Sequence, residues 1–155
     1  MKKILVFSDT HGYTDPCMSI IEKNRPSAII HAGDCTDDAE DLKYIYPDIP
    51  IYYVKGNNDF FSSAAMRMTV IIEGVRIFIT HGHEQRVKHE SDYRTLRDVA
   101  KEANASLIIF GHTHIPYTSY DYGVTMINPG SVRFSGTYAV IEINKGKVDT
   151  KILDI

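Results

Sequence analysis

Short apolar runs alternate with helical patterns over the first two-thirds of the chain, and this alternation restricts the fold more than any other feature. The runs are continuous and rich in β-branched and aromatic residues, as in strands that are buried on both faces. They span residues 3–7, 28–30, 51–54 and 107–110. Helices are expected from Asp15 to the Arg25-Pro26 break, over 37–46 and after a cap at Ser91. Strands that alternate with helices predict an α/β fold.

The pattern changes where strands follow one another directly. Residues 66–72 and 75–80 flank Glu73-Gly74, which predicts a tight hairpin. Three further strand-like runs close the chain, at 124–127, 137–143 and 148–153. The chain is therefore expected to begin as βαβαβ, to end mostly as antiparallel strands, and to form a layered α/β fold on two sheets. Its 155 residues fit one domain over 1–155.

Charge, cysteine content and apolar run length argue against several classes of protein. The net charge of −3 disfavours a general nucleic-acid binder, which needs a basic surface, although it does not exclude a nuclease. Two cysteines are too few for a disulfide scaffold. No apolar run is long enough for a signal peptide or a membrane helix, so no membrane partner and a cytoplasmic localisation are expected.

Five strand-like runs each lead into a cluster of polar residues. The clusters read S-D-T-H, H-A-G-D, G-N-N-D, H-G-H and G-H-T-H. In α/β proteins ligands bind beyond the carboxyl ends of the strands, where such clusters would lie. The residues in them that suit a metal ion are Asp9, His11, Asp34, Asn57, His81, His112 and His114. Seven nitrogen and oxygen donors exceed the about four that one tetrahedral ion takes, and they are enough for two ions that share a carboxylate.

Taken alone, most of these clusters have a simpler explanation. A D-x-H pair is usually a helix cap beside a surface histidine, and G-D or G-N-N-D is usually a turn, because Asn and Asp tolerate left-handed backbone. H-G-H is explained as readily by two loop histidines, and only G-H-T-H is a stronger signal. Taken together, the simple explanation requires five coincidences, each just past a strand, so a metal site is the better interpretation.

In this order the clusters resemble the motifs of the calcineurin-like metallophosphoesterase superfamily. The matching motifs are D-x-H at 9–11, G-D at 33–34, G-N-x-D at 56–59, G-H at 82–83 or its neighbour His81, and G-H-x-H at 111–114. The short chain and the later Asn128-Pro129-Gly130-Ser131 are similar to the small bacterial and archaeal phosphodiesterase branch. The resemblance implies a two-sheet αββα sandwich, with a parallel-rich N-terminal half and antiparallel C-terminal strands.

The resemblance also implies two divalent ions and a role for each donor. The ions are expected to be Mn²⁺, with Fe, Zn, Ni or Mg as alternatives, because these donors accept all of them. A water shared by two ions has a lowered pKa, and the resulting hydroxide attacks phosphorus in line. The expected activity is hydrolysis of a small phosphodiester. One ion would be held by Asp9, His11 and His114, the other by Asn57, His81 and His112, and both by the bridging Asp34.

The chain departs from the family pattern at Asn58. Larger members carry a histidine after the G-N pair, and the small branch commonly has a cysteine there. An amide donates hydrogen bonds but cannot act as an acid, so modest turnover and a preference for good leaving groups are expected. Asn58, Asn57 and Asp34 form the predicted catalytic set. The neighbouring Asp59 is expected to orient a ligand histidine.

Three other functions are compatible with the same motifs. They are a phosphomonoesterase, a nuclease, and a non-catalytic protein-binding scaffold, since the superfamily includes a retromer subunit that serves in protein assembly. Degraded scaffolds tend to lose ligands, whereas every predicted ligand position here holds a competent donor. This favours an enzyme. The sequence leaves the oligomeric state open, a homo-oligomer included.

Overall fold

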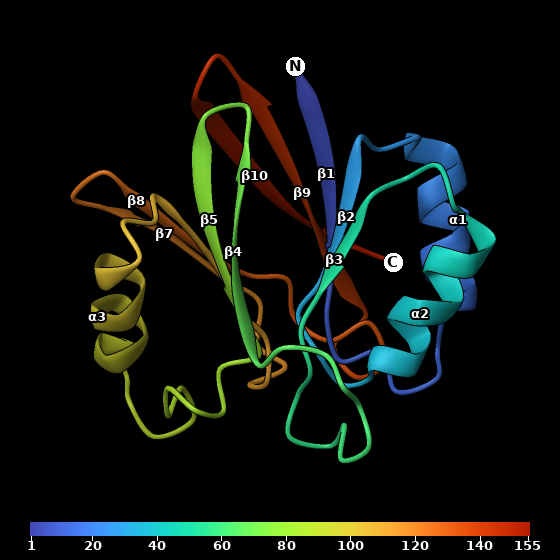
Figure 1. The fold of residues 1–155 in the computed structure, drawn as a ribbon, viewed down its shortest axis with the longest axis horizontal. Helices are drawn as coiled ribbons and strands as arrows, with labels where there is room; N and C mark the ends of the chain where they lie inside the picture. The colour runs from blue at the N-terminus through green and yellow to red at the C-terminus, as the bar shows by residue number, and fades with distance from the viewer.

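The computed structural model describes residues 1–155 as two five-stranded β-sheets that pack face to face (Figure 1). The first sheet contains β1 (Lys2–Phe7), β2 (Ala28–His31), β3 (Ile51–Tyr53), β9 (Thr137–Asn144) and β10 (Lys147–Asp154). The second contains β4 (Arg67–Ile72), β5 (Val75–Thr80), β6 (Leu107–Ile109), β7 (Tyr117–Asp121) and β8 (Val124–Asn128). Their strand orders are β10-β9-β1-β2-β3 and β4-β5-β6-β8-β7. The expected two-sheet α/β sandwich is confirmed.

The apolar residues form three layers that explain this stacking. Between the sheets lies a buried cluster that includes Val6 and Ile30 from the first sheet and Ile79 from the second. Continuous apolar strands are buried on both faces, so each sheet needs a second cover. Helices α1 (Asp15–Asn24) and α2 (Thr36–Ile45) cover the first sheet through contacts such as Ile21 and Leu42, and α3 (Arg94–Glu102) covers the second through Leu96.

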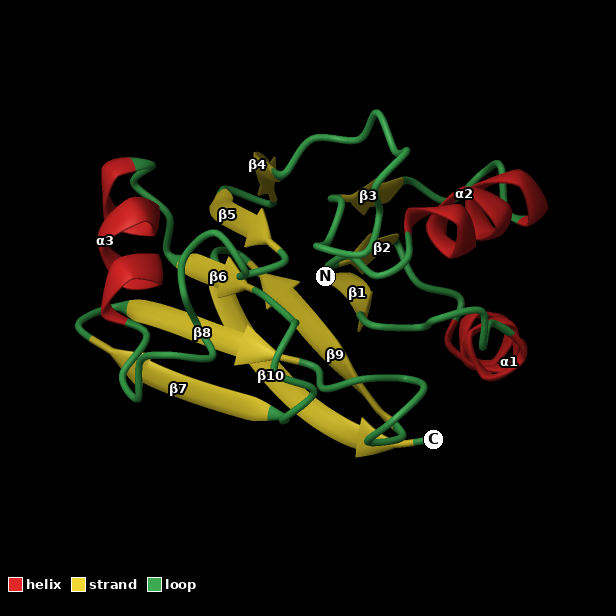
Figure 2. Cartoon of the chain, turned by 90° about the horizontal axis from the view of Figure 1, so that it is seen from below, coloured by secondary structure: helices red, strands yellow, loops and turns green.

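Strand direction decides where the loops meet. β1, β2 and β3 are parallel, and β9 and β10 add antiparallel pairs at the other side of that sheet. In the second sheet β5, β6 and β8 are parallel, while β4 and β7 are antiparallel edge strands. β8 therefore departs from the expected run of antiparallel C-terminal strands. The carboxyl ends of β1, β2, β3, β5, β6 and β8 lie at one edge of the sandwich, below the sheets in Figure 1 and facing the viewer in Figure 2.

One strand was missed and one local expectation was wrong. The edge strand β7 was not predicted, because its sequence YTSYD is polar and pairing with β8 stabilises it instead. Ser91 does not cap helix α3, which begins at Arg94. The side chain of Glu90 accepts hydrogen bonds from the backbone N–H and the hydroxyl of Thr95, at 2.9 and 2.6 Å, and so supplies the capping interaction that Ser91 was expected to make.

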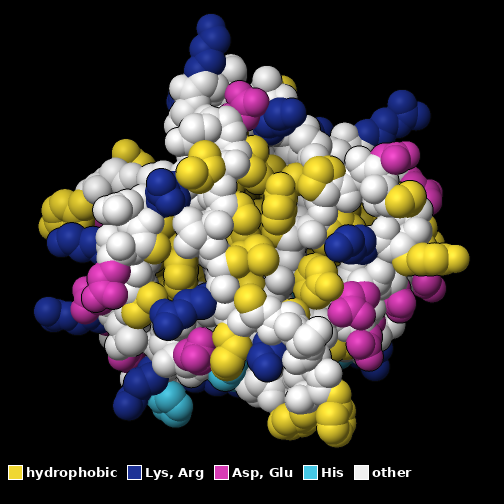
Figure 3. All heavy atoms as spheres, viewed as in Figure 1, with side chains coloured by type: hydrophobic (Ala, Val, Ile, Leu, Met, Phe, Trp, Pro, Cys, Tyr) yellow, Lys and Arg dark blue, Asp and Glu magenta, His cyan; other side chains and the backbone are white.

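An apolar region lies on the surface beside an edge strand of each sheet. Hydrophobic side chains are visible in the middle of the face that carries β3 and β4, which are edge strands (Figure 3). Tyr52, Met68, Val70 and Ile72 are partly buried there and pack against the core between the sheets. No helix of the structure has the length and apolar character needed to cross a membrane.

Candidate metal centre

The seven predicted donors lie together at the edge where the parallel strands end. They come from loops that follow four strands and from the residue directly after β5. β5 runs parallel to β6, which is the condition that the sequence could not prove and that brings its end to this edge. The donors by strand are Asp9 and His11 after β1, Asp34 after β2, Asn57 after β3, His81 after β5, and His112 and His114 after β6.

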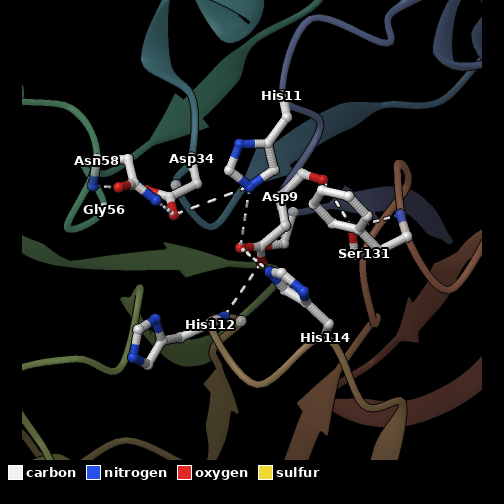
Figure 4. A network of polar contacts seen from close by, with 12 residues as sticks. Asp9, His11, Asp34, Gly56, Asn58, His112, His114 and Ser131 are labelled. Atoms are coloured by element: carbon white, nitrogen blue, oxygen red, sulfur yellow. Dashed lines mark hydrogen bonds and ion pairs between the residues drawn. The ribbon is translucent and has the colours of Figure 1, made fainter.

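The first group of donors comprises Asp9, His11 and His114. Their donor atoms all lie within 4.8 Å of one another. His114 Nε2 is 3.1 Å and His11 Nε2 is 3.9 Å from Asp9 Oδ1 (Figure 4). His11 Nε2 is buried and has no hydrogen-bond partner. A buried polar atom without a partner is costly, and a metal ion in this position would relieve that cost.

The second group centres on His81, whose side chain is fully buried. His81 Nδ1 lies 2.7 Å from the carbonyl oxygen of Ala32, so this nitrogen carries the hydrogen and donates it. Nε2 faces the side-chain oxygen of Asn57 at 3.1 Å, Asp34 Oδ2 at 3.4 Å and His112 Nδ1 at 3.2 Å. Acceptors that face one another in this way need a cation between them, which is a proton on His81 or a metal ion.

The pKa values of His81 and His112 follow from this arrangement. Burial lowers the pKa of His81, but the hydrogen bond to Asp34 and the charges of Asp9 and Asp34 outweigh it and raise that pKa above its ordinary value. Burial, and then the positive charge of His81, lowers the pKa of His112 to about 4. His112 is therefore neutral at physiological pH, as a metal ligand must be.

Asp34 lies between the two groups. Its Oδ2 is 3.4 Å from His81 Nε2 and 4.0 Å from His11 Nε2. Burial raises the pKa of Asp34, but His81 and the two N–H donors of Asn58 outweigh burial and hold that pKa well below its ordinary value. The Asn58 donors are its backbone N–H, at 3.1 Å from Oδ1, and its side-chain Nδ2, at 2.9 Å from Oδ2. Asp34 is thus an ionised carboxylate within reach of both groups.

Backbone conformation is unusual at these positions. Positive φ values are uncommon for residues other than glycine and indicate local strain, which clusters at functional sites. Asp34 also needs a glycine beside it, because a Cβ atom on Gly56 would collide with its carboxylate. Gly111 plays the same part for Ser8 and Asp9. The donors with positive φ are Asp9 (53°), His11 (43°), Asp34 (51°), His112 (70°) and His114 (61°).

Comparison with known proteins identifies the family. The model of the calcineurin-like phosphoesterase superfamily domain matches residues 1–146. The chain belongs to this superfamily. It is 31% identical over 156 residues to a probable metallophosphoesterase of Mycoplasma pneumoniae, covering 96% of this chain and 94% of the relative. A solved structure of a predicted phosphoesterase from Streptococcus pneumoniae superposes with a TM-score of 0.82 at 25% identity, covering 99% of this chain and 89% of that one.

Two relatives carry names of different kinds. Phosphodiesterase MJ0936 of Methanocaldococcus jannaschii is 28% identical over 145 residues, covering 83% of this chain and 82% of the relative. Vacuolar protein sorting-associated protein 29 of Schizosaccharomyces pombe is 28% identical over 160 residues, covering 97% of this chain and 82% of the relative. The chain is therefore similar both to a relative that is named as an enzyme and to a relative that is named as a trafficking protein.

In this superfamily member, Asp59 holds two loops together and does not orient a histidine as expected. Its carboxylate accepts hydrogen bonds from the backbone N–H groups of Asp34, Thr36 and Gly56, at 3.0, 3.0 and 2.7 Å. The loops after β2 and β3 are thereby fixed to each other. Backbone N–H groups of a loop need acceptors, and the buried carboxylate of Asp59 supplies them, so the expectation named the wrong donors to this carboxylate.

The motif Asn128-Pro129-Gly130-Ser131 fixes two further loops, a role that sequence reasoning missed. The Asn128 side chain donates to the carbonyl of Gly111 at 3.1 Å and to the hydroxyl of Thr113 at 3.0 Å. The Ser131 hydroxyl donates to the carbonyl of Asp9 at 2.8 Å (Figure 4). The family motif itself was the only signal available, because these partners lie 15 to 122 residues apart.

Proposed function

We propose that the protein is a dinuclear metal-dependent phosphodiesterase, which hydrolyses a small phosphate diester. The observation that carries the proposal is a pair of adjoining donor groups, Asp9, His11, His114 and Asp9, Asp34, His81. Asp34 Oδ2 lies 4.0 Å from His11 Nε2 and 3.4 Å from His81 Nε2, within reach of both groups. Two ions that are held by adjoining donor groups would supply the activated water for in-line attack and the positive charge that neutralises the phosphoryl oxygens.

We assign one ion to Asp9, His11 and His114, and the other to Asn57, His81 and His112, with Asp34 shared by both. The unpartnered Nε2 of His11 supports the first assignment. The Nε2 of His81, which faces oxygen and nitrogen acceptors, supports the second. These donors contain no thiolate, which suits Mn²⁺ as well as Fe, Zn, Ni or Mg, and we propose Mn²⁺.

The chain's own contribution to the reaction is positioning. The carbonyl of Ala32 fixes the ring of His81, and the amide of Asn58 fixes Asp34. The Asn58 side chain cannot protonate a leaving group. Protonation of a poor leaving group must then come from another residue or from water, and unless one of these supplies the proton, esters with good leaving groups are expected to react fastest.

The second candidate is a protein-binding scaffold, which the trafficking name of the Schizosaccharomyces pombe relative favours. A scaffold does not need catalytic donors. Here each donor position keeps a competent side chain, and Asp34 remains ionised among them. The phosphodiesterase name of the archaeal relative supports the enzyme. A diester is preferred to a monoester because of the name of this archaeal relative, and a small substrate is preferred to a nucleic acid because the net charge is −3.

The decisive experiment measures metal binding and hydrolysis together. Chelator-treated protein is loaded with Mn²⁺ or Ni²⁺, its metal content is measured after dialysis, and it is assayed on bis(p-nitrophenyl) phosphate. The monoester p-nitrophenyl phosphate and a single-stranded oligonucleotide are assayed beside it. We expect about two ions for each chain and metal-dependent release of p-nitrophenol from the diester.

The control and the contrary results separate the candidates. Asp149→Asn, which changes an exposed carboxylate on β10, should keep the metal content and the rate. Faster hydrolysis of the monoester or the oligonucleotide would reassign the substrate. Absence of bound metal, or bound metal with no hydrolysis of any of the three, would overturn the enzyme and favour the scaffold.

A further inference from the structure

An exposed aromatic ring lies directly beside the first group of donors. Phe134 keeps 63% of its surface exposed. Its ring stacks on the ring of His114 with centroids 5.1 Å apart and an interplanar angle of 20°, and its centroid is 5.4 Å from that of His11. One face of Phe134 thus covers a donor histidine, and the residue keeps most of its surface exposed beside it.

Hydrogen bonds fix the loop that carries this ring to the donor loop after β1. The backbone N–H of Phe134 donates to the hydroxyl of Ser131 at 2.9 Å, and this hydroxyl donates to the carbonyl of Asp9. The backbone N–H groups of Val132 and Arg133 donate to the carbonyls of Ser8 and Asp9, at 3.1 and 3.3 Å. The position of Phe134 relative to the donors is therefore set by backbone contacts. A backbone held in this way pays little ordering entropy when a ligand binds.

Phe134 could serve only to shield the histidines from solvent, but this role would account for the covered face of its ring and not for the exposed surface. A large apolar side chain that is exposed beside a polar site is a common feature of ligand pockets, where apolar groups bind the body of the ligand and polar groups orient it. A ring that is bonded to phosphorus through one oxygen lies within a few atoms of the phosphoryl group. Phe134 lies one stacking distance from a donor histidine, so the ring of such an ester could reach its free face.

We propose that Phe134 is a binding subsite for a planar ring on the substrate, and that the preferred diesters carry an aryl or nucleoside group. The proposal rests on the proposed function, since it places the phosphoryl group at the donors. Stacking on an aromatic side chain tolerates any ring with a π-face, so the subsite selects planar groups over alkyl groups without selecting one base. Phe134 is a specificity-determining residue in this reading.

The test compares two ligands that differ only in the ring. Binding of phenylphosphonate and methylphosphonate to the Mn²⁺-loaded protein is measured by calorimetry, which needs no turnover. The wild type should bind phenylphosphonate about tenfold more tightly. In Phe134→Ala this preference should fall to less than about twofold, while methylphosphonate affinity and metal content stay unchanged; Phe134→Trp should restore it. KM for bis(p-nitrophenyl) phosphate should rise about tenfold in Phe134→Ala with kcat little changed.

The controls distinguish failure of the subsite from failure of the proposed function. Tyr122→Ala, which removes a fully exposed ring from the β7–β8 turn at the far end of β8, should keep the preference. Equal binding of the two phosphonates by the wild type, or equal weakening of both by Phe134→Ala, would overturn the subsite alone. Loss of bound metal in Phe134→Ala would show that the ring only shields His114. No binding of either phosphonate to metal-loaded wild type would overturn the proposed function as well.

Discussion

The two groups of donors differ in how firmly the protein holds them. On one side, His81 is fully buried, its Nδ1 is fixed by the carbonyl of Ala32, and its Nε2 has three polar neighbours. On the other side, the His11 and His114 side chains keep 26% and 33% of their surface exposed, and His11 Nε2 has no partner. We call the His81 side the fixed half and the His11 side the open half because of these histidines, although Asn57 on the fixed side is exposed and Asp9 on the open side is buried. Asp34 lies between the two halves.

This difference separates two tasks that a phosphoesterase site must perform. A ligand histidine that is already buried and fixed, as His81 is, favours retention of an ion because it needs no reorganisation. An open half gives solvent and substrate access, and it is this half that Phe134 borders. The ion proposed for the His81 side would therefore exchange more slowly than the ion proposed for the His11 side.

Asp34→Asn should have the largest effect, because this carboxylate serves both halves. We expect loss of both ions after dialysis and a decrease of about 10³-fold or more in kcat/KM. Metal analysis and the diester assay check this, with Asp149→Asn as the matched carboxylate control on the surface. Retention of either ion at the wild-type level would show that the halves do not share Asp34.

The pH dependence of the unfolding free energy should depend on His31, which belongs to a buried hydrogen-bond network. His31 Nδ1 accepts a hydrogen bond from the N–H of Gly33, its Nε2 contacts the Thr10 hydroxyl, and that hydroxyl donates to Asp38. Burial, only partly opposed by Asp38, lowers the pKa of His31 from 6.5 to about 4. The unfolded chain therefore binds a proton below about pH 6.5 that the folded chain refuses until about pH 4, so stability falls as the pH falls through this window.

The unfolding free energy should fall by about 3 kcal/mol between pH 6.5 and 4 because of His31. Urea unfolding of the metal-free protein at several pH values measures it. His31→Gln, which can keep both hydrogen bonds, should flatten the slope, whereas His89→Gln at an exposed position should not. An unchanged slope in His31→Gln would assign the acid sensitivity to other groups, such as His112.

The sequence predicted the donors but not what holds them. Asp9, His11 and the other donors were identifiable because their residue types recur just past predicted strands, and strand ends in an α/β fold converge. The contacts of Asp59 and Ser131 were not identifiable in the same way. They join loops whose spacing depends on the packing of both sheets, and hydrogen bonds from the Asp34 N–H to Asp59 or from the Ser131 hydroxyl to Asp9 leave no local pattern. Polar β7 likewise exists only because β8 lies beside it.

Replacing one histidine from each half should lower the unfolding free energy of the metal-free protein by different amounts. His81→Ala leaves a buried void, an unpaired carbonyl at Ala32 and two carboxylates without their cation, so we expect a loss of about 2 kcal/mol in unfolding free energy. His11→Ala removes a partly exposed side chain with no hydrogen bond at Nε2 and should cost less than about 0.5 kcal/mol. Urea unfolding at pH 7 compares them. Equal losses would mean that the two halves are held alike.

The smallest expected effect concerns Asn58, beside Asp34, and tests whether the site lacks a group that can protonate the leaving oxygen. Asn58→His introduces a group that can protonate a leaving oxygen, at a position whose present side chain lies 2.9 Å from Asp34 Oδ2. We expect a gain of roughly tenfold in kcat for a diester with an alkyl leaving group, below the full range for an optimised general acid, and little change for a p-nitrophenyl diester. Asn58→Gln is the matched variant that adds no acid. A gain of equal size for both leaving groups, or in both variants, would show that the substitution repositions Asp34 and that proton supply does not limit the reaction.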